Sequence, residues 1–222
     1  MTRARAGSRN RRYAVRSGWL LALCFAIGLA APLLWRWVSA DPGKDRRQVA
    51  AAGAALPGLQ VDAPPWVAER ERLSERLRSI RLPVLAAEGR AVHLHQHLSL
   101  FVHGERLPVA SAIGIGRNSG FFAPIHTHGA DGVIHVESPP IKRPYTLGAF
   151  FDVWGVRFSA DCLGGSCRGN GRAVRVYVDG ARVRGDPRAV ALGSRQEIVV
   201  SFGLASELPR PVSASYRFPE NY

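Results

Sequence analysis

Residues 91–102 alternate apolar and polar side chains with a period of two, and this alternation constrains the fold more than any other feature of the chain. The even positions, apolar except for one glutamine, are Val92, Leu94, Gln96, Leu98, Leu100 and Val102. Successive side chains of a β-strand point to opposite faces, so we predict a strand here with one face buried and the other exposed. His103-Gly104 predicts a turn into a second strand at 105–109.

The chain after residue 83 carries shorter strand signals and one clear helix signal. Strands are predicted at 124–128, 132–137, 173–178, 182–184 and 197–202. Thr146 is placed to cap a helix over 147–154 that buries four large apolar side chains. We therefore predict an α+β domain over 83–209, strand-rich with one main helix, for which a β-grasp arrangement is one candidate, followed by a C-terminal tail at 210–222.

A separate short helix is predicted at 66–81, after Pro64-Pro65 and before Pro83. One helical stripe would then hold the apolar residues Trp66, Leu73, Leu77 and Ile80. Residues 39–65, rich in alanine, glycine and proline, are predicted to be a linker. We expect the helix to serve as a juxtamembrane stalk or as a lid on the domain, with its charged face in solvent.

Residues 17–35 carry no charge, and six arginines with no acidic residue precede them. This length approaches the ~20 apolar residues that cross a bilayer, and basic residues on the N-terminal side keep that end in the cytoplasm. We predict a cytoplasmic N-terminus at 1–16 and a single transmembrane anchor at 17–38, with the main domain on the extracytoplasmic side of the cell membrane. A signal peptide cleaved after Ala40 is the alternative, and it would make the domain secreted.

The formal net charge of +13 is concentrated in residues 1–47, which hold ten basic residues against Asp41 and Asp45. A DNA-binding domain places its basic residues on a recognition element, and a single-strand binder interleaves them with aromatic residues. In this chain the excess flanks the apolar segment instead, where it sets the orientation of that segment. We therefore expect the membrane as a partner, through the N-terminal helix, and no nucleic acid.

All seven histidines of the chain lie in one short stretch, at His93, His95, His97, His103, His126, His128 and His135. The alternation of side chains along a strand puts the first three on one face, the pair at 126 and 128 on another, and His135 with Glu137 on a third. Imidazole is the commonest side-chain ligand for zinc, copper and similar ions. The candidate metal ligands are therefore His93, His95, His97, His126, His128, His135 and Glu137.

The three histidines of the first strand span ~13 Å and cannot easily share one ion. We expect a site built from two of them, from His126 and His128 and, as a further member, from His135. Glu137 would supply an oxygen ligand or orient a histidine. His103 lies in a turn and is expected to be exposed. The alternative is that individual histidines form a polar face or hydrogen bonds in the core.

The choice of ion follows from the donor types. Histidine with a carboxylate suits Zn(II), Cu(II), Ni(II) or Fe(II), and zinc or copper is the expected cofactor. Met1 is the only methionine, so thioether capture of Cu(I) outside the membrane is not available.

Cys162 and Cys167 flank the short segment Leu-Gly-Gly-Ser. In an oxidising exterior such a pair predicts a disulfide within a loop. The alternative is a thiolate pair that joins the histidine site.

Several motifs follow one another between His93 and Gly203: HLHQHLSLFVHGERLPV, PIHTHGADGVIHVESP, YTLGAFFDVWGVRFS, CLGGSC, VRVYVDG and GDPRAVALGSRQEIVVSFG. This series, which covers about half of the chain, resembles an uncharacterised family of membrane-anchored bacterial and archaeal proteins. The resemblance implies an exported domain with histidine motifs in this order, and it implies no reaction. Such proteins often carry aspartate in place of Gly129, so any role of that aspartate in the site would be missing here.

Three functional hypotheses remain open. The leading one is an exported domain that binds a divalent transition metal for storage, sensing or delivery. The second is a metal-dependent envelope enzyme acting on a small substrate, with Glu137 as a nearby base and no catalytic residue assigned. The third is a structural or interaction domain of the cell envelope that uses no metal.

Overall fold

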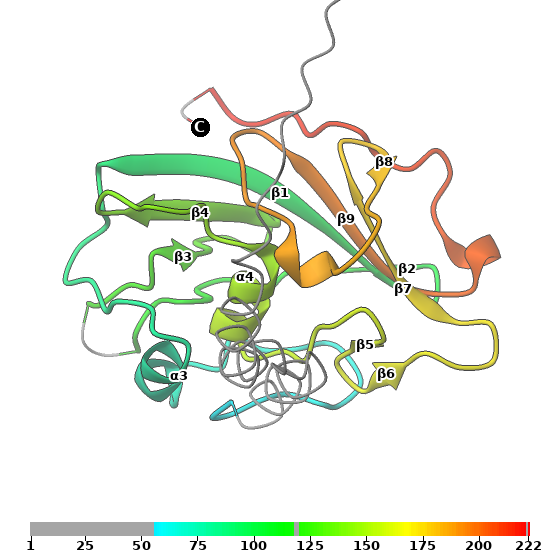
Figure 1. Ribbon diagram of the computed structural model, residues 1–222, viewed down its shortest axis with the longest axis horizontal. Helices are drawn as coiled ribbons and strands as arrows, with labels where there is room; N and C mark the ends of the chain where they lie inside the picture. The colour runs from blue at the N-terminus through cyan, green and yellow to red at the C-terminus, as the bar shows by residue number, and fades with distance from the viewer. Residues whose placement is uncertain (1–55, 118–119, 221) are drawn as a thin grey trace, which may run out of the picture. The chain divides into compact units, whose positions relative to one another are not determined.

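The computed structural model describes residues 56–117, 120–220 and 222 (Figure 1). The predicted cytoplasmic N-terminus, the anchor at 17–38 and the first part of the linker lie outside these residues. Within the described part of the chain, no helix is both long and apolar enough to cross a membrane. This part is an α+β domain that combines a mixed sheet with two α-helices, as predicted.

A mixed sheet of seven strands organises the domain around the long strand β1 (Val92–Val102). The other six strands are β2 (Glu105–Leu107), β3 (Ile125–His126), β4 (Val133–Ser138), β7 (Ala173–Val178), β8 (Ala181–Arg182) and β9 (Glu197–Gly203). The strand order is β3-β4-β1-β9-β7-β8, and β2 pairs with β1. β1 is antiparallel to β4 and parallel to β9, so the central strand pairs with one strand from the middle of the domain sequence and one from near its end.

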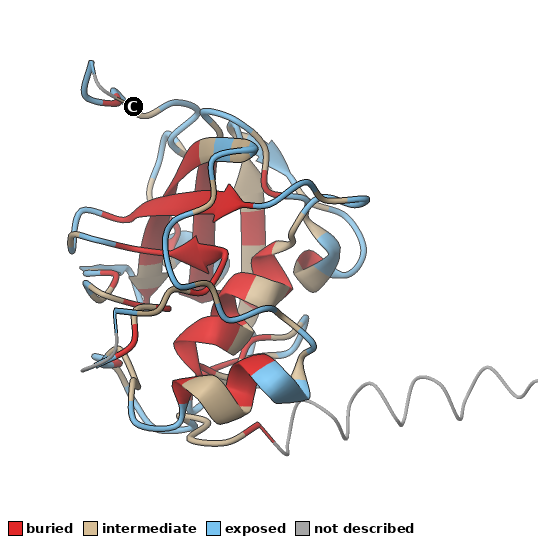
Figure 2. Ribbon diagram, turned by 90° about the vertical axis from the view of Figure 1, so that its left-hand side faces the viewer, coloured by how far each residue is buried: buried red, intermediate tan, exposed pale blue. Residues whose placement is uncertain are grey.

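From His95 to Leu100 both faces of β1 are buried, which corrects the prediction of a half-buried strand, whereas His93 at its start is exposed (Figure 2). On the even face, Leu98 and Leu100 enter the hydrophobic core. On the odd face the C-terminal segment covers the strand: the ring of Tyr222 lies 4.6 Å from that of His95, and the ring of Tyr216 stacks 3.7 Å from that of His97. The predicted tail at 210–222 therefore belongs to the folded domain, because it shields the histidine face of the sheet.

The main helix α4 (Leu147–Trp154) has the predicted bounds and the predicted cap. The Oγ1 atom of Thr146 accepts a hydrogen bond from the backbone N–H of Ala149 at 3.2 Å, and Gly155 ends the helix with φ of 78°. The helix lies on the even face of the sheet in Figure 1, where its aromatic residues join the core formed by β1. This arrangement leaves the opposite face of the sheet to the histidines.

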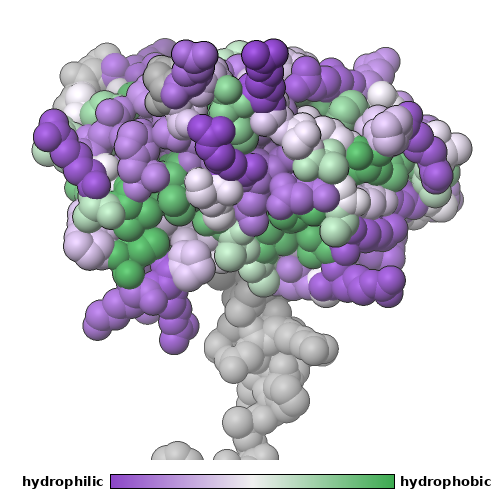
Figure 3. Space-filling view, turned by 90° about the horizontal axis from the view of Figure 1, so that it is seen from above, coloured by the Kyte–Doolittle hydropathy of each residue, from purple (hydrophilic) through white to green (hydrophobic). Residues whose placement is uncertain are grey.

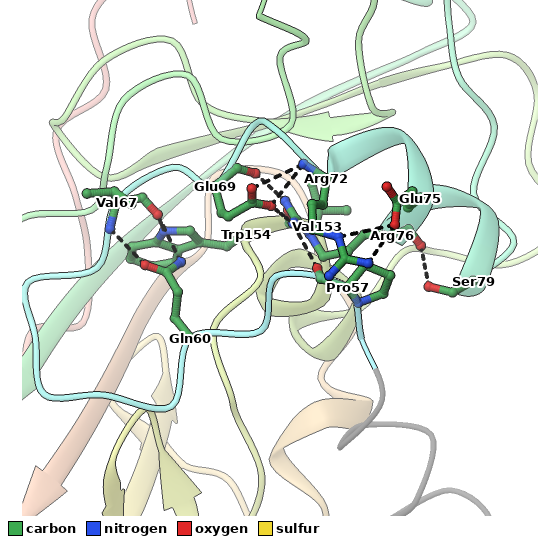
Figure 4. Close-up of polar contacts among 10 residues, drawn as sticks. All are labelled: Pro57, Gln60, Val67, Glu69, Arg72, Glu75, Arg76, Ser79, Val153 and Trp154. Atoms are coloured by element: carbon green, nitrogen blue, oxygen red, sulfur yellow. Dashed lines mark hydrogen bonds and ion pairs between the residues drawn. The ribbon is translucent and has the colours of Figure 1, made fainter.

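The helix predicted at 66–81 is shorter than expected, because only α3 (Leu73–Ser79) is helical. Trp66 instead turns into the core, where its ring meets that of Trp154 edge-on at 6.2 Å. The guanidinium of Arg76 is fully buried (Figure 4); it pairs with the carboxylate of Glu69 and donates to the carbonyl oxygen of Val153 at 3.1 Å. The segment is therefore an integral part of the domain.

The predicted disulfide between Cys162 and Cys167 is present. It joins β5 (Cys162–Leu163) to β6 (Ser166–Cys167) across a small hairpin. Two short 3-10 helices, η2 (Pro187–Ala189) and η3 (Ala205–Glu207), complete the described elements.

The surface seen in Figure 3, on the side where the C-terminal segment runs in Figure 1, is mainly hydrophilic with smaller hydrophobic patches. Among the described residues, the exposed large hydrophobic side chains are three valines, Val61, Val67 and Val84. Scattered valines need no partner to explain them. The feature that calls for a functional explanation is the set of histidines on the sheet.

Candidate metal centre

Three neighbouring strands bring the histidines together through their register. His95 of β1 lies opposite His135 of β4, and His93 lies opposite Glu137. On its other side, β4 pairs His135 with His126 of β3. Directly opposite residues of an antiparallel pair have Cβ atoms ~5 Å apart, so alternation along three strands is enough to gather these side chains.

The first pair of donors lies on β1. The Nε2 atoms of His93 and His95 are 3.1 Å apart, and the Nε2 atom of His93 lies 3.4 Å from Oε1 of Glu137. The same Oε1 lies 3.2 Å from Nδ1 of His135. Glu137 is thus in contact with a histidine of each strand of the β1–β4 pair.

The second pair of donors lies at the end of β3. The Nε2 atoms of His126 and His128 are 3.2 Å apart. Oε1 of Glu88 lies 3.1 Å from Nε2 of His128 and 3.6 Å from Nε2 of His126. Glu88 stands in the irregular segment before β1, and nothing in its local sequence indicated that it belongs to the cluster.

Gly89 explains how Glu88 reaches this place. The backbone of Gly89 passes so close to β4 that an added Cβ would lie 2.3 Å from the Cα atom of Ser138. Only glycine permits that approach, and the approach holds the neighbouring carboxylate of Glu88 over the end of β3. A glycine next to an acidic residue is too common a pattern to have predicted this contact.

The hydrogen bonding of His126 fixes its tautomer. Nδ1 of His126 lies 3.1 Å from the carbonyl oxygen of Ala123, and a carbonyl can only accept. Nδ1 therefore carries the proton, and Nε2, which faces His128 and Glu88, presents its lone pair. This is the arrangement by which proteins orient a histidine that binds a metal ion.

Burial keeps the inner histidines neutral. It lowers the pKa of His95 and of His126 to about 4 and that of His135 to about 3, and repulsion from neighbouring positive charge, mainly that of other histidines, adds to the effect. Burial also raises the pKa of Glu137, and the nearby carboxylate of Glu88 raises it further. The protein thus holds several nitrogen lone pairs and two carboxylates in one place, an arrangement that a bound cation would stabilise.

The spacing of the donor atoms fits a metal site. Ligand atoms that lie ~2.0–2.1 Å from a tetrahedral zinc ion are ~3.3 Å from one another. The contacts of 3.1 to 3.4 Å within the cluster are close to that value. Two groups have all their donor atoms within 4.8 Å of one another: His93, His95, His135 and Glu137, and His126, His128, His135 and Glu137.

Access to the cluster is through two of its histidines. The side chains of His93 and His128 are 55% and 43% exposed, whereas those of His126 and His135 are buried. The exposed histidines therefore form an open rim through which an ion can reach the buried inner ligands from solvent.

His97 lies outside the cluster, although it was a candidate ligand. Its Nδ1 atom lies 2.5 Å from Oε2 of Glu197 on β9, and its Nε2 atom donates to the carbonyl oxygen of Asp131 at 3.0 Å. Both ring nitrogens are thus used within the core, and the carboxylate of Glu197 also accepts from the hydroxyl of Ser99 at 2.8 Å. His97 joins β1 to β9 and is not placed to bind the ion.

His103 and the two cysteines lie outside the histidine cluster. His103 sits in the turn after β1 and is partly exposed, facing Glu207 at 3.6 Å. Cys162 and Cys167 are bonded to each other, so they do not supply thiolates to the histidine cluster.

Comparison with known proteins adds no assignment to this geometry: no family model, no curated protein and no solved structure matches the chain. The function must therefore be inferred from the cluster itself.

Proposed function

We propose that this domain binds a divalent transition metal, zinc or copper, through histidines carried on neighbouring strands. The observation that carries the proposal is the convergence of imidazole nitrogens and one carboxylate within 4.8 Å of one another. The role that follows is storage, sensing or delivery of the ion, since the inner ligands are rigid and the rim is open to solvent.

The protonation state of the cluster supports binding at neutral pH. A histidine binds a metal ion only in its neutral form, so protons compete with the ion. Because the pKa values of His95, His126 and His135 are about 4 or lower, this competition is weak at pH 7. Nitrogen donors with a carboxylate suit Zn(II) and Cu(II).

The compartment is part of the same proposal. The arginines that precede residues 17–35 orient an anchor so that the domain lies outside the cytoplasm. A disulfide such as that between Cys162 and Cys167 persists in oxidising compartments and is rare in the cytosol. The ion that the domain meets is then metal of the cell envelope.

We also propose that the domain has a β-grasp-like fold. We propose further that the chain belongs to the family of membrane-anchored proteins that its motifs resemble. Two strands from the first half of the domain and two from the second half flank the parallel pair β1–β9, and α4 crosses between the halves. This order, β4-β1-β9-β7, is the one that a β-grasp core has.

A metal-dependent enzyme is the second candidate. The observation that favours it is the carboxylate of Glu88, which is 38% exposed and lies at the open rim beside His128. A carboxylate in that position can take a proton from a small molecule bound at an ion. An exchangeable water on the bound metal would favour this candidate over a closed storage site.

The test is metal binding by the full chain, purified without a histidine tag and exposed to zinc or copper. We expect stoichiometric metal by mass spectrometry after removal of free ion. A variant with His93→Ala and His128→Ala should bind at least ~10-fold more weakly, because both changes remove exposed donors without disturbing the core. His103→Ala, a histidine outside the cluster, is the matched control and should bind as the parent does.

Two results would contradict the proposal. One is a parent protein that binds neither ion, which would favour a structural or interaction role in the envelope. The other is unchanged affinity in the double variant, which would move the site away from the cluster.

A further inference from the structure

We propose that the cluster holds two metal ions side by side, one on each histidine pair, with the carboxylate of Glu137 between them. The inference rests on the proposed function and goes beyond it, since a single ion would satisfy that function. It follows from how the donors are distributed over the three strands.

The two histidine pairs stand on opposite sides of β4. His93 and His95 belong to β1, whereas His126 and His128 belong to β3 and the residues that follow it, and β4 lies between these strands. Adjacent strands are ~4.8 Å apart, so the strands that carry the pairs are separated by ~10 Å. The side chains of both pairs approach one another over β4, but the two Nε2 atoms of each pair come together at a separate point.

One ion cannot use both pairs as the structure holds them. Two ligand atoms on the same zinc ion are at most ~4.2 Å apart, twice the metal–nitrogen distance. Within each pair the nitrogens meet this limit, at 3.1 and 3.2 Å. Among the described residues, neither of the groups with donor atoms within 4.8 Å unites a histidine of the first pair with one of the second; the groups have only His135 and Glu137 in common.

The shared residues come from β4 and lie where a bridge is needed. Glu137 contacts His93 at 3.4 Å and His135 at 3.2 Å through the same oxygen, and a carboxylate has a second oxygen to offer. In sites with two metal ions the ions are ~3.5–4 Å apart. A carboxylate between two donor pairs spans that separation.

The second pair also has a carboxylate of its own. Glu88 lies 3.1 Å from His128 and 3.6 Å from His126, and it belongs to neither of the two groups whose donor atoms all lie within 4.8 Å of one another. Seven donor groups in all are more than the four of a tetrahedral ion. Two ions use all seven groups: each ion takes one histidine pair and one carboxylate, and His135 completes the ligands of one of them.

The test is the number of ions bound by the tag-free full chain. Saturation with zinc, followed by removal of free ion and native mass spectrometry, should give two ions per chain. His93→Ala and His128→Ala, made separately, each remove one exposed donor from one pair and should each leave a single ion. His103→Ala should keep two.

The outcomes separate this inference from the function on which it rests. No ion in the parent overturns both. One ion in the parent, lost or weakened in the variants, overturns the second site and leaves the proposed function standing. Two ions that both survive in His93→Ala and in His128→Ala would overturn the assignment of the pairs.

A spectroscopic readout tests whether the two ions are neighbours. With Cu(II) as the probe, the electron paramagnetic resonance signal should grow with the first equivalent and fall as the second enters, because neighbouring Cu(II) ions couple. In His93→Ala the signal should stay at one isolated ion per chain. Two full, uncoupled spins in the parent would overturn the bridge at Glu137.

Discussion

At His126 a single hydrogen bond decides which ring nitrogen is available. Its Nδ1–H donates to the carbonyl oxygen of Ala123, so Nε2 faces the cluster with a free lone pair. Glu88 is likewise positioned by a backbone contact, because its neighbour Gly89 packs closely against Ser138. The chemistry of the site thus depends on backbone contacts of residues that would not themselves touch an ion.

Gly89→Ala should therefore weaken metal binding without removing a donor. The added Cβ would lie 2.3 Å from the backbone of Ser138, so the segment that carries Glu88 must move. We expect a loss of about 1–3 kcal/mol in the free energy of unfolding and a fall of ~10-fold in affinity for zinc. Gly169→Ala is the control, because a Cβ there meets nothing within 4 Å. Equal affinity in both variants would show that the position of Glu88 does not matter.

The buried histidines predict how the metal-free protein responds to acid. Their folded-state pKa values, about 3 to 4, lie below the ordinary value of 6.5, so the unfolded chain binds more protons between these limits. Stability should be complete above pH 6.5 and should decline as the pH falls towards 4. The raised pKa of Glu137 opposes this trend, but one carboxylate acts against three histidines.

Thermal unfolding of the metal-free chain from pH 7 to pH 4 measures this effect. His135→Gln should flatten the decline, since glutamine does not titrate, whereas His103→Ala should leave it unchanged. An unfolding midpoint that stays constant over the whole range would contradict the account of neutral, buried imidazoles.

Among the elements, α3 shows how a polar residue can fix the place of a helix. Arg76 is fully buried, and its guanidinium joins Glu69 to the backbone carbonyls of Pro57 and Val153 (Figure 4). These contacts tie three parts of the chain to α4. Removing one partner of such a buried pair leaves an uncompensated charge.

Arg76→Ala should accordingly lower the free energy of unfolding by about 3–5 kcal/mol, measured by denaturant titration. The matched control is Arg72→Ala on the same helix. Arg72 pairs with Glu75 in solvent, so its loss should leave the midpoint nearly unchanged. If the two variants unfold at the same denaturant concentration, the buried contacts of Arg76 do not stabilise the domain.

The elements that could be predicted from the sequence are those with local signals. α4 has its cap at Thr146, its glycine stop at Gly155 and its apolar spacing within a few residues, so its bounds follow directly. The alternation in each strand predicted which histidines share a face, but the order and register of β1, β4 and β3, which bring them together, were not predicted.

What the sequence could not reveal depends on contacts between distant residues. The second buried face of β1 comes from the C-terminal segment, including Tyr216 and Tyr222. His97 is not part of the site because it binds Glu197 instead, and a partner 100 residues away could not be identified from the sequence. Glu88 enters the site through a packing contact, for which no periodic pattern exists.

At the scale of the whole domain, the two faces of the sheet have different roles. Its even face and α4 form the hydrophobic core, whereas its odd face carries the histidines and is covered in part by the C-terminal segment (Figures 1 and 2). The disulfide of the β5–β6 hairpin is distinct from this cluster, and it stabilises the fold by limiting the unfolded chain.

Replacing both cysteines, with Cys162→Ser and Cys167→Ser, should therefore affect stability and not metal content. The closed loop is short, with a sequence separation of 5, so we expect a loss of about 2 kcal/mol in the free energy of unfolding. Metal content by mass spectrometry should equal that of the parent. A variant that folds but loses its metal would show that the cysteines contribute to the site after all.

The most direct test of the central claim, that the histidine cluster binds a transition metal, is X-ray absorption spectroscopy at the zinc edge of the loaded full chain. We expect nitrogen and oxygen ligands at ~2.0–2.2 Å, with the outer-shell scattering of at least two imidazole rings per ion. Sulfur at ~2.3 Å, or a shell of oxygen alone without imidazole scattering, would contradict it.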